Sequence, residues 1–114
     1  MPRVALTSNT LRLVRHLFQL EQQAAVVEKL EVECASDLPF MSDATRESLE
    51  RIRFAVLKLS KGSAIELARA IALAKVDWRD VLVAAQFAND RRAHESWLHE
   101  ELDGAEDEAN SRSC

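Results

Sequence analysis

Apolar residues recur at helical spacing over most of the chain, and no segment shows the period-two alternation that marks a strand. The longest helical pattern covers residues 9–34 and follows three competent N-caps, Thr7, Ser8 and Asn9. Its apolar positions alternate between spacings of four and three, which is typical of a heptad seam. They are Leu13, Leu17, Leu20, Ala24, Val27 and Cys34, interrupted once by Glu31. The pattern predicts one long first helix, with a break at residues 21–23 as the alternative.

A second helix is expected between the internal proline and the first glycine. Pro39 cannot continue a helix, and Ser42 or Asp43 is placed to cap the next one, which extends to about Lys61. Gly62 suits the left-handed position that ends such a helix. The buried face of this second helix is predicted to contain Leu49, Ile52, Val56 and Leu59, with Phe54 and Leu57 to one side. Arg51 and Arg53 are expected on its solvated surface.

The third predicted helix, residues 64–75, is apolar around almost its whole circumference. A helix with so little polar surface is typical of the centre of a bundle, so we expect the other helices to surround it. Ser63 and Glu66 have the spacing of a capping box, in which each side chain bonds the backbone amide of the other residue.

Two shorter helices are expected in the last part of the chain. Asp77 is placed to cap the fourth, and Asn89 or Asp90 to start the fifth, which ends before Gly104. The predicted fold is therefore all-α: a compact bundle of about five helices, with a long first helix and a central apolar third helix. We expect residues 1–103 to form this single helical domain.

Charge is distributed unevenly along the chain. Residues 1–99 carry nearly equal numbers of basic and acidic side chains, whereas residues 100–114 combine many acids with only Arg112. Residues 104–114 are therefore expected to be an acidic, disordered tail. The nearly neutral body lacks the basic field that nucleic-acid binding usually needs, so no nucleic-acid partner is expected.

Composition fits an ordinary globular protein, since 47% of the 114 residues are hydrophobic and 30% are charged. Cys34 and Cys114 are too few for a disulfide framework and lack metal-site spacing. The sequence shows no signal-peptide pattern and no apolar run long enough to cross a membrane. We therefore expect a cytoplasmic location and no membrane association.

The segment HESWLHE resembles a zinc-protease motif, but its two histidines are one position too far apart. His94 and His99 are separated by five residues, which places them roughly 140° apart around a helix. They cannot bind one metal ion together while the segment stays helical, and the other histidine, His16, lies far away in sequence. Two half-exposed histidines on a helix are the expectation.

Other candidate chemistry also has a structural interpretation. Asp77 and Asp80 both fall in the first turn of a predicted helix, where carboxylates cap and interact with the helix dipole. Trp78 and Trp97 suit the gaps between helices. Gly62 stands alone, so no glycine-rich phosphate loop exists. The sequence predicts no catalytic residue, no metal ligand and no cofactor.

A helix-turn-helix alignment over residues 67–85 is the strongest argument for a nucleic-acid function. Its turn would fall on residues 72–74, which are strong helix formers without a glycine. The helix that would read bases offers little beyond Arg79 and Gln86.

Two stretches, RIRFAVLKLS at residues 51–60 and DWRDVLVAA at residues 77–85, resemble small uncharacterised bacterial helical proteins. The resemblance implies a bacterial cytoplasmic origin and carries over no activity, site or substrate. At one position the chain departs from the pattern, because Gln86 stands where a glycine is expected before Phe-Ala. A turn is therefore not expected at Gln86.

The leading functional hypothesis is a non-catalytic helical interaction module that binds itself as a homodimer or binds another protein. The predicted first helix carries apolar residues on two adjacent faces, and a single chain can cover only one of them. The predicted interface consists of Leu13, Leu17, Leu20, Ala24 and Val27. The alternatives are a small transcriptional or nucleic-acid-associated helical regulator, and an enzyme whose site assembles only in three dimensions.

Overall fold

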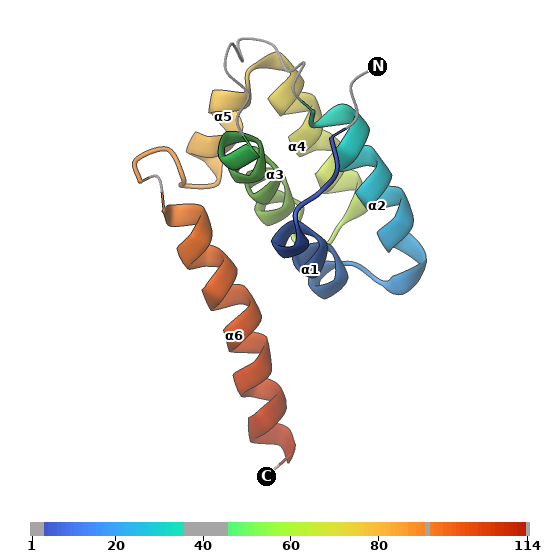
Figure 1. Ribbon diagram of the computed structural model, residues 1–114, viewed down its shortest axis with the longest axis vertical. Helices are drawn as coiled ribbons and strands as arrows, with labels where there is room; N and C mark the ends of the chain where they lie inside the picture. The colour runs from blue at the N-terminus through green and yellow to red at the C-terminus, as the bar shows by residue number, and fades with distance from the viewer. Residues whose placement is uncertain (1–3, 36–45, 91, 114) are drawn as a thin grey trace.

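The computed structural model describes residues 4–35, 46–90 and 92–113, with the backbone alone described for Arg46 and residues 104–113. This part of the chain contains six helices and no strand (Figure 1). They are α1 (Ser8–Leu17), α2 (Leu20–Glu33), α3 (Arg46–Ser60), α4 (Ala64–Val76), α5 (Trp78–Ala84) and α6 (Ala93–Ser113). The predicted all-α fold is confirmed. The segment around Pro39 and the candidate caps Ser42 and Asp43 lie outside the described residues.

The prediction of a single long first helix is wrong, because the helix is interrupted between α1 and α2. Phe18 and Gln19 adopt extended backbone angles, and the buried ring of Phe18 packs into the core. The side chain of Gln23 then donates hydrogen bonds to the carbonyl oxygens of Phe18, at 3.0 Å, and Arg15, at 3.5 Å. A continuous helix over residues 9–34 would be roughly 39 Å long. The break at Phe18 and Gln19 instead folds α2 back against α1. It lies two residues before residues 21–23, where the alternative prediction placed a break.

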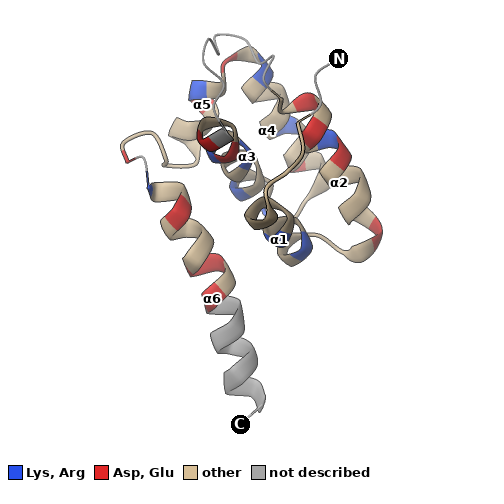
Figure 2. Ribbon diagram, in the orientation of Figure 1, with Lys and Arg blue, Asp and Glu red and all other residues tan. Residues whose placement is uncertain are grey.

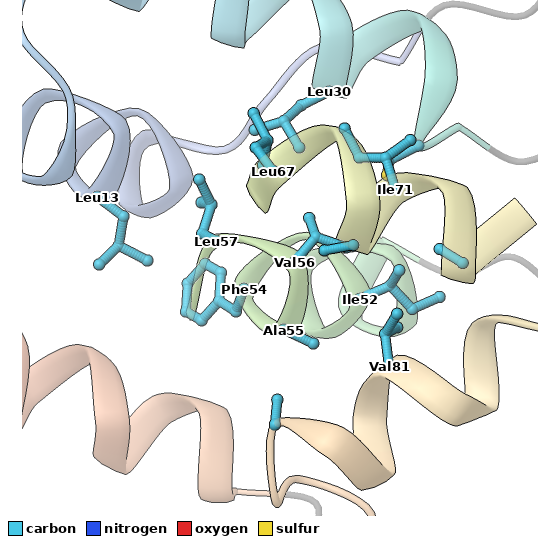
Figure 3. Packing of buried hydrophobic residues seen from close by; sticks show 14 of the residues in the cluster. Leu13, Leu30, Ile52, Phe54, Ala55, Val56, Leu57, Leu67, Ile71 and Val81 are labelled. Carbon is cyan, nitrogen blue, oxygen red and sulfur yellow. The ribbon is translucent and has the colours of Figure 1, made fainter. Parts of the chain in front are cut away.

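The central helix is α3. Helices α1, α4, α5 and α6 all contact it, and its side chains are buried on several sides. Leucine, isoleucine and valine side chains from the surrounding helices point toward it in Figure 3. The predicted second helix therefore has the several neighbours expected from Phe54 and Leu57, which are both buried.

The predicted third helix, α4, does not occupy the centre. It buries one face against α2, α3 and α5, while its opposite face meets solvent. Ile65 and Val76 on that opposite face are each 69% exposed. The expectation of a surrounded helix is wrong because the neighbouring helices cover only one side of α4.

Arg53 lies in the interior with 2% of its surface exposed, so the expectation of a solvated side chain is wrong. Its guanidinium donates hydrogen bonds to carbonyl oxygens from two separate segments. The acceptors are Cys34 at 3.0 Å, Leu30 at 3.4 Å, Ala5 at 3.1 Å and Val4 at 2.6 Å. Burial lowers the pKa of Arg53, and the neighbouring Cys34 and Glu31 act in the opposite direction. The side chain fastens the N-terminal segment and the end of α2 to α3.

The turn between α3 and α4 depends on Gly62, as predicted. Its φ is 81°, and Lys61 before it also has a positive φ of 50°. A Cβ atom on residue 62 would lie 2.7 Å from the carbonyl oxygen of Leu17. Glycine is therefore required here both for the backbone conformation and for the close approach of α1.

A turn does form at Gln86, so the expectation from its missing glycine is wrong. Gln86 adopts a φ of 66°, and its amide donates to the carbonyl oxygen of Val83 at 3.0 Å. The amide of Phe87 donates to the carbonyl oxygen of Leu82 at 2.8 Å, which completes a Schellman motif. The ammonium of Lys58 donates to the carbonyl oxygen of Ala85 at 2.8 Å and lies 5.0 Å from the ring centroid of Phe87.

The N-caps predicted at Ser63 and Asp77 are present, but the capping box at Ser63 is only half formed. The Ser63 hydroxyl accepts a hydrogen bond from the Glu66 amide at 3.3 Å, and the Asp77 carboxylate accepts one from the Arg79 amide at 3.0 Å. The reciprocal half of the capping box is not formed. The Glu66 carboxylate pairs with Arg69 at 2.7 Å, and the Ser63 amide donates to the carbonyl oxygen of Ser60.

The last helix, α6, runs through Gly104 to Ser113, so the predicted helix end before Gly104 is wrong. Its first turns lie against α1 and α3, and the rest leads away from the bundle (Figure 1). The division into a domain of residues 1–103 and a tail of residues 104–114 stays a prediction.

Replacing Arg53 with methionine should lower the free energy of unfolding by about 3 kcal/mol, because buried carbonyl groups lose their donor. Urea unfolding measures this loss. Arg12→Met is the control, since Arg12 is an exposed arginine and its loss should change stability by less than about 0.5 kcal/mol. Equal midpoints for the two variants would contradict the structural role of Arg53.

Gln86→Gly should raise the free energy of unfolding by about 0.5–1 kcal/mol, because glycine adopts a positive φ without steric cost. Gly62→Ala should act in the opposite direction by more than about 1 kcal/mol, since it adds both strain and the contact with Leu17. Thermal and urea unfolding of both variants give the two signs. A destabilised Gln86→Gly variant would show that the glutamine side chain supports the turn.

Ser63→Ala should cost about 1 kcal/mol, the usual loss for an N-cap. Glu66→Ala should cost only about 0.3 kcal/mol, because its carboxylate makes an exposed ion pair rather than a cap. The comparison of the two urea midpoints tests the half-formed box. Equal losses would mean that Glu66 also caps the helix in solution.

Candidate interaction surface

The solvent-facing side of α4 carries apolar residues where a surface helix normally carries polar ones. Ile65, Ala68, Ala72 and Val76 follow at spacings of three, four and four, and all four are exposed. At about 100° per residue they fall within roughly 80° of the helix circumference. We call these four residues the α4 outer face. The opposite side is buried in the core and consists of Leu67, Ala70, Ile71 and Ala74. Helix α4 is thus apolar on two opposite sides.

The charged residues that border the α4 outer face are paired within the chain. Arg69 forms an ion pair with Glu66 at 2.7 Å, one turn apart on α4. Lys75 contacts the carboxylate of Glu33 on α2 at 2.5 Å, and Lys29 contacts the same carboxylate at 3.0 Å. The hydrogen bond from Lys75 lowers the pKa of Glu33, so this carboxylate stays ionised to lower pH. The positive charges at the border of the outer face are therefore largely, but not fully, balanced by the two carboxylates.

The five residues predicted as an interface do not form one exposed stripe. Leu13 is completely buried in the core of its own chain, and Leu17 and Val27 are partly buried against it. Leu20 is 80% exposed, and Ala24 one turn later is exposed as well. The break after α1 separates the first two residues from the last three. Only Leu20 and Ala24 are freely accessible to a partner.

His94 and His99 lie on different sides of α6, as their spacing predicted, but His94 is buried rather than half-exposed. His94 is 1% exposed, and its ring centroid lies 5.4 Å from that of Phe54 and 6.3 Å from that of Phe87. His99 is exposed. Trp97 completes this aromatic cluster at 6.1 Å from Phe54 and 6.0 Å from Phe87. The cluster attaches the beginning of α6 to the bundle.

The tryptophans and the two aspartates considered as candidate functional residues stabilise the fold or lie at the surface. Trp78 is partly buried against the core, so both tryptophans pack between helices as expected. Asp77 caps α5 and its carboxylate also pairs with Arg79 at 2.7 Å. That interaction with Arg79 lowers the pKa of Asp77. Asp80 is exposed. No acid–base pair forms from these two aspartates.

A hollow of about 200 Å³ lies between α1, α3 and α6. It is lined by Phe54 and Leu98 together with several polar side chains, among them Arg12, Glu95 and His99. These three make no hydrogen bond or ion pair with the described residues. Glu50, also in the lining, accepts a hydrogen bond from the Thr7 hydroxyl at 2.6 Å. Glu50 is thus engaged with the residue that caps the start of α1.

Cys34 is not a reactive thiol in this fold. It is fully buried, and burial raises its pKa to about 12, which keeps the sulfur protonated at neutral pH. Within the described ranges, histidine, cysteine and acidic side chains form no group that could hold a metal ion. Cys114 lies outside these ranges.

The surface gives little support to nucleic-acid binding. In Figure 2 the basic residues are interrupted by acidic and other residues and form no continuous stripe on the described part. Helix α4 continues through residues 72–74, where the turn of a helix-turn-helix would fall, and ends at Val76. Arg79, which would read bases, is held by Asp77. In the described part of the chain, no helix combines the length and apolarity needed to cross a bilayer.

Comparison of the chain with protein-family models, curated proteins and solved structures finds no match in any of the three. The resemblance of residues 51–60 and 77–85 to small bacterial proteins therefore stays an expectation.

Proposed function

We propose that the chain is a non-catalytic helical interaction module that binds protein through the α4 outer face, either a second copy of itself or another protein. One observation carries this proposal: α4 exposes Ile65 and Val76 to 69% on the side opposite its buried face. Covering the exposed part of each side chain contributes about 1–2 kcal/mol to an association. A helix that is apolar on both sides needs a second partner for its outer side.

The chain leaves more apolar surface uncovered on α4 than on the helices formed by residues 8–33. In α1 and α2, the fold itself uses Leu13, Leu17 and Val27. What remains there is Leu20 and Ala24, which is too small a surface for a specific contact. The α4 outer face extends over four residues and three helical turns, so it offers more contact area on a rigid element.

The alternatives have weaker support. An enzyme needs several groups oriented toward each other, and in the hollow between α1, α3 and α6 the described residues offer one such contact, from the N-cap residue Thr7 to Glu50. A nucleic-acid-associated regulator needs a basic surface, and basic and acidic side chains are mixed on this chain. We further propose a cytoplasmic location in a bacterium, where a buried free thiol such as Cys34 is stable in its reduced form.

Site-specific photo-cross-linking in the cells that naturally express the chain tests the proposal. A benzophenone amino acid replaces Ile65 or Val76 in two variants, and Leu20 in a matched control. All three positions are strongly exposed, so the substitution does not disturb the core. We expect protein adducts from positions 65 and 76 and none from position 20.

The masses of the adducts identify the type of partner. A product at twice 12.8 kDa contains a second copy of the chain, and any other mass contains a different protein. Adding Ile65→Glu to the variant with the cross-linker at position 76 should remove the adduct, because it places a charge within the contact. Adducts from position 20 alone, or from none of the positions, would contradict the proposal.

A further inference from the structure

The α4 outer face has a symmetric order of side-chain sizes. Large residues stand at its two ends, Ile65 and Val76, and two alanines stand between them. The midpoint between the large residues lies between Ala70 and Ile71, and the midpoint between the two alanines lies at Ala70. These midpoints differ by half a residue, which is about 0.8 Å along a helix. The order of sizes, large, small, small and large, is the same in both directions and the spacings differ by only one residue, so the pattern suits a copy of itself.

We infer that the α4 outer face binds the α4 outer face of a second copy, with the two helices antiparallel across a twofold axis near Ala70. This inference rests on the proposed function and specifies its partner. The arrangement places Ile65 of one copy against Val76 of the other. It places Ala68 against Ala72, so both contacts occur twice, as an isologous interface requires.

Side-chain size favours close contact at the centre of this interface. Ala68 and Ala72 project only a methyl group each, so two helices can approach to an axial separation of about 8 Å. The larger Ile65 and Val76 side chains then cover both ends of the contact, where they exclude water from the alanines. Exposed alanine between exposed large residues thus has a function in the dimer that it lacks in the single chain.

Charge permits the approach of two identical surfaces. Two basic residues border the outer face, and unpaired they would repel their symmetry mates. Arg69 is held by Glu66, and Lys75 is held by Glu33. Arg69 and Lys75 are thus each in contact with a carboxylate, and Lys75 shares its carboxylate with Lys29. A second copy therefore meets an apolar centre whose bordering cations are in contact with carboxylates.

Helix dipoles distinguish antiparallel from parallel pairing. The N-terminal end of a helix carries partial positive charge, and its C-terminal end carries partial negative charge. Antiparallel pairing sets the start of one α4 beside the end of the other, which is attractive. Parallel pairing sets two like ends together and also brings both Lys75 side chains to one end of the interface. The antiparallel dimer is therefore favoured.

The interface is small, which sets the expected affinity. Helix α4 has 13 residues and a length of roughly 20 Å. One helix pair of this length buries less than the roughly 800 Å² per partner of a standard interface. We expect a reversible dimer with a dissociation constant on the order of 10–100 µM.

Light scattering coupled to size exclusion, over a range of concentrations with reductant present, measures the dimer. The mass should rise from 12.8 kDa toward twice that value as the concentration increases. Ile65→Glu should raise the dissociation constant at least tenfold, and the control Leu20→Glu should leave it unchanged. Both side chains are exposed, and unchanged urea midpoints verify that neither variant unfolds. A wild-type monomer at millimolar concentration overturns the inference, and loss of the dimer only in Leu20→Glu moves the interface to α2.

Disulfide trapping tests the antiparallel arrangement. Ala68→Cys and Ala72→Cys are made separately in chains that also carry Cys114→Ser, and one of the two chains carries a size tag. Cys34 remains in place, because its buried thiol does not react. Mild oxidation of the mixture should give mainly the mixed disulfide between positions 68 and 72, since antiparallel packing brings these two within disulfide reach.

The outcomes distinguish failure of the antiparallel dimer from failure of the proposed interaction function. Disulfides that join identical positions, 68 with 68 and 72 with 72, indicate parallel packing and overturn the geometry. A monomeric chain that still gives photo-adducts with another protein retains the interaction module and overturns the second copy as its partner. A monomeric chain without photo-adducts overturns both.

Discussion

The arrangement of the bundle depends on a positive charge that is buried among carbonyl groups. Arg53 of the central helix donates to carbonyl oxygens at the end of α2 and in the N-terminal segment. A guanidinium costs free energy to bury, and its several fixed donors offset that cost only when every acceptor is in place. It therefore fixes two segments at once. Because α2 is held here, Glu33 at its end reaches Lys75, and α2 covers one flank of α4. The exposed outer face of α4 is a consequence of this position.

A second group of contacts attaches α6 independently of Arg53. His94 and Trp97 insert next to Phe54 of α3 and Phe87, and His16 of α1 contacts Glu101 at 3.4 Å. Phe87 reaches its place because the turn at Gln86 directs the chain inward after α5. Arg51 and Lys58 donate to carbonyl oxygens of this same turn region. The strained left-handed residue is thus compensated by one buried ring and two capped carbonyl groups.

Local signals in the sequence predicted much of the fold, whereas tertiary signals were missed. Ser63, Asp77 and Gly62 act within a few residues of themselves, so their caps and turn could be read directly. The break after α1 contains neither glycine nor proline and follows from the burial of Phe18, which only the packed structure decides. Arg51 and Arg53 were both expected in solvent, since a sequence does not reveal which carbonyl groups an arginine will meet. Arg51 is half-buried and donates to the carbonyl oxygen of Phe87. Local rules therefore located helices and left their relative positions open.

The position of the α4 outer face is also decided by tertiary packing, which the sequence did not reveal. The sequence predicted more apolar surface than one chain covers and placed the excess on the first helix, whereas the structure exposes Ile65 and Val76 on α4. A helix that is apolar on all sides was assigned to the centre because one chain was assumed to supply all its neighbours. In the structure α3 takes the centre, because α1, α4, α5 and α6 all pack on it. Helix α4 then lies at the surface with its sequence unchanged, and the pattern that looked like complete burial becomes a surface that a second copy can cover. If the dimer forms, the sequence pattern of α4 correctly describes a buried helix, but one buried between two chains.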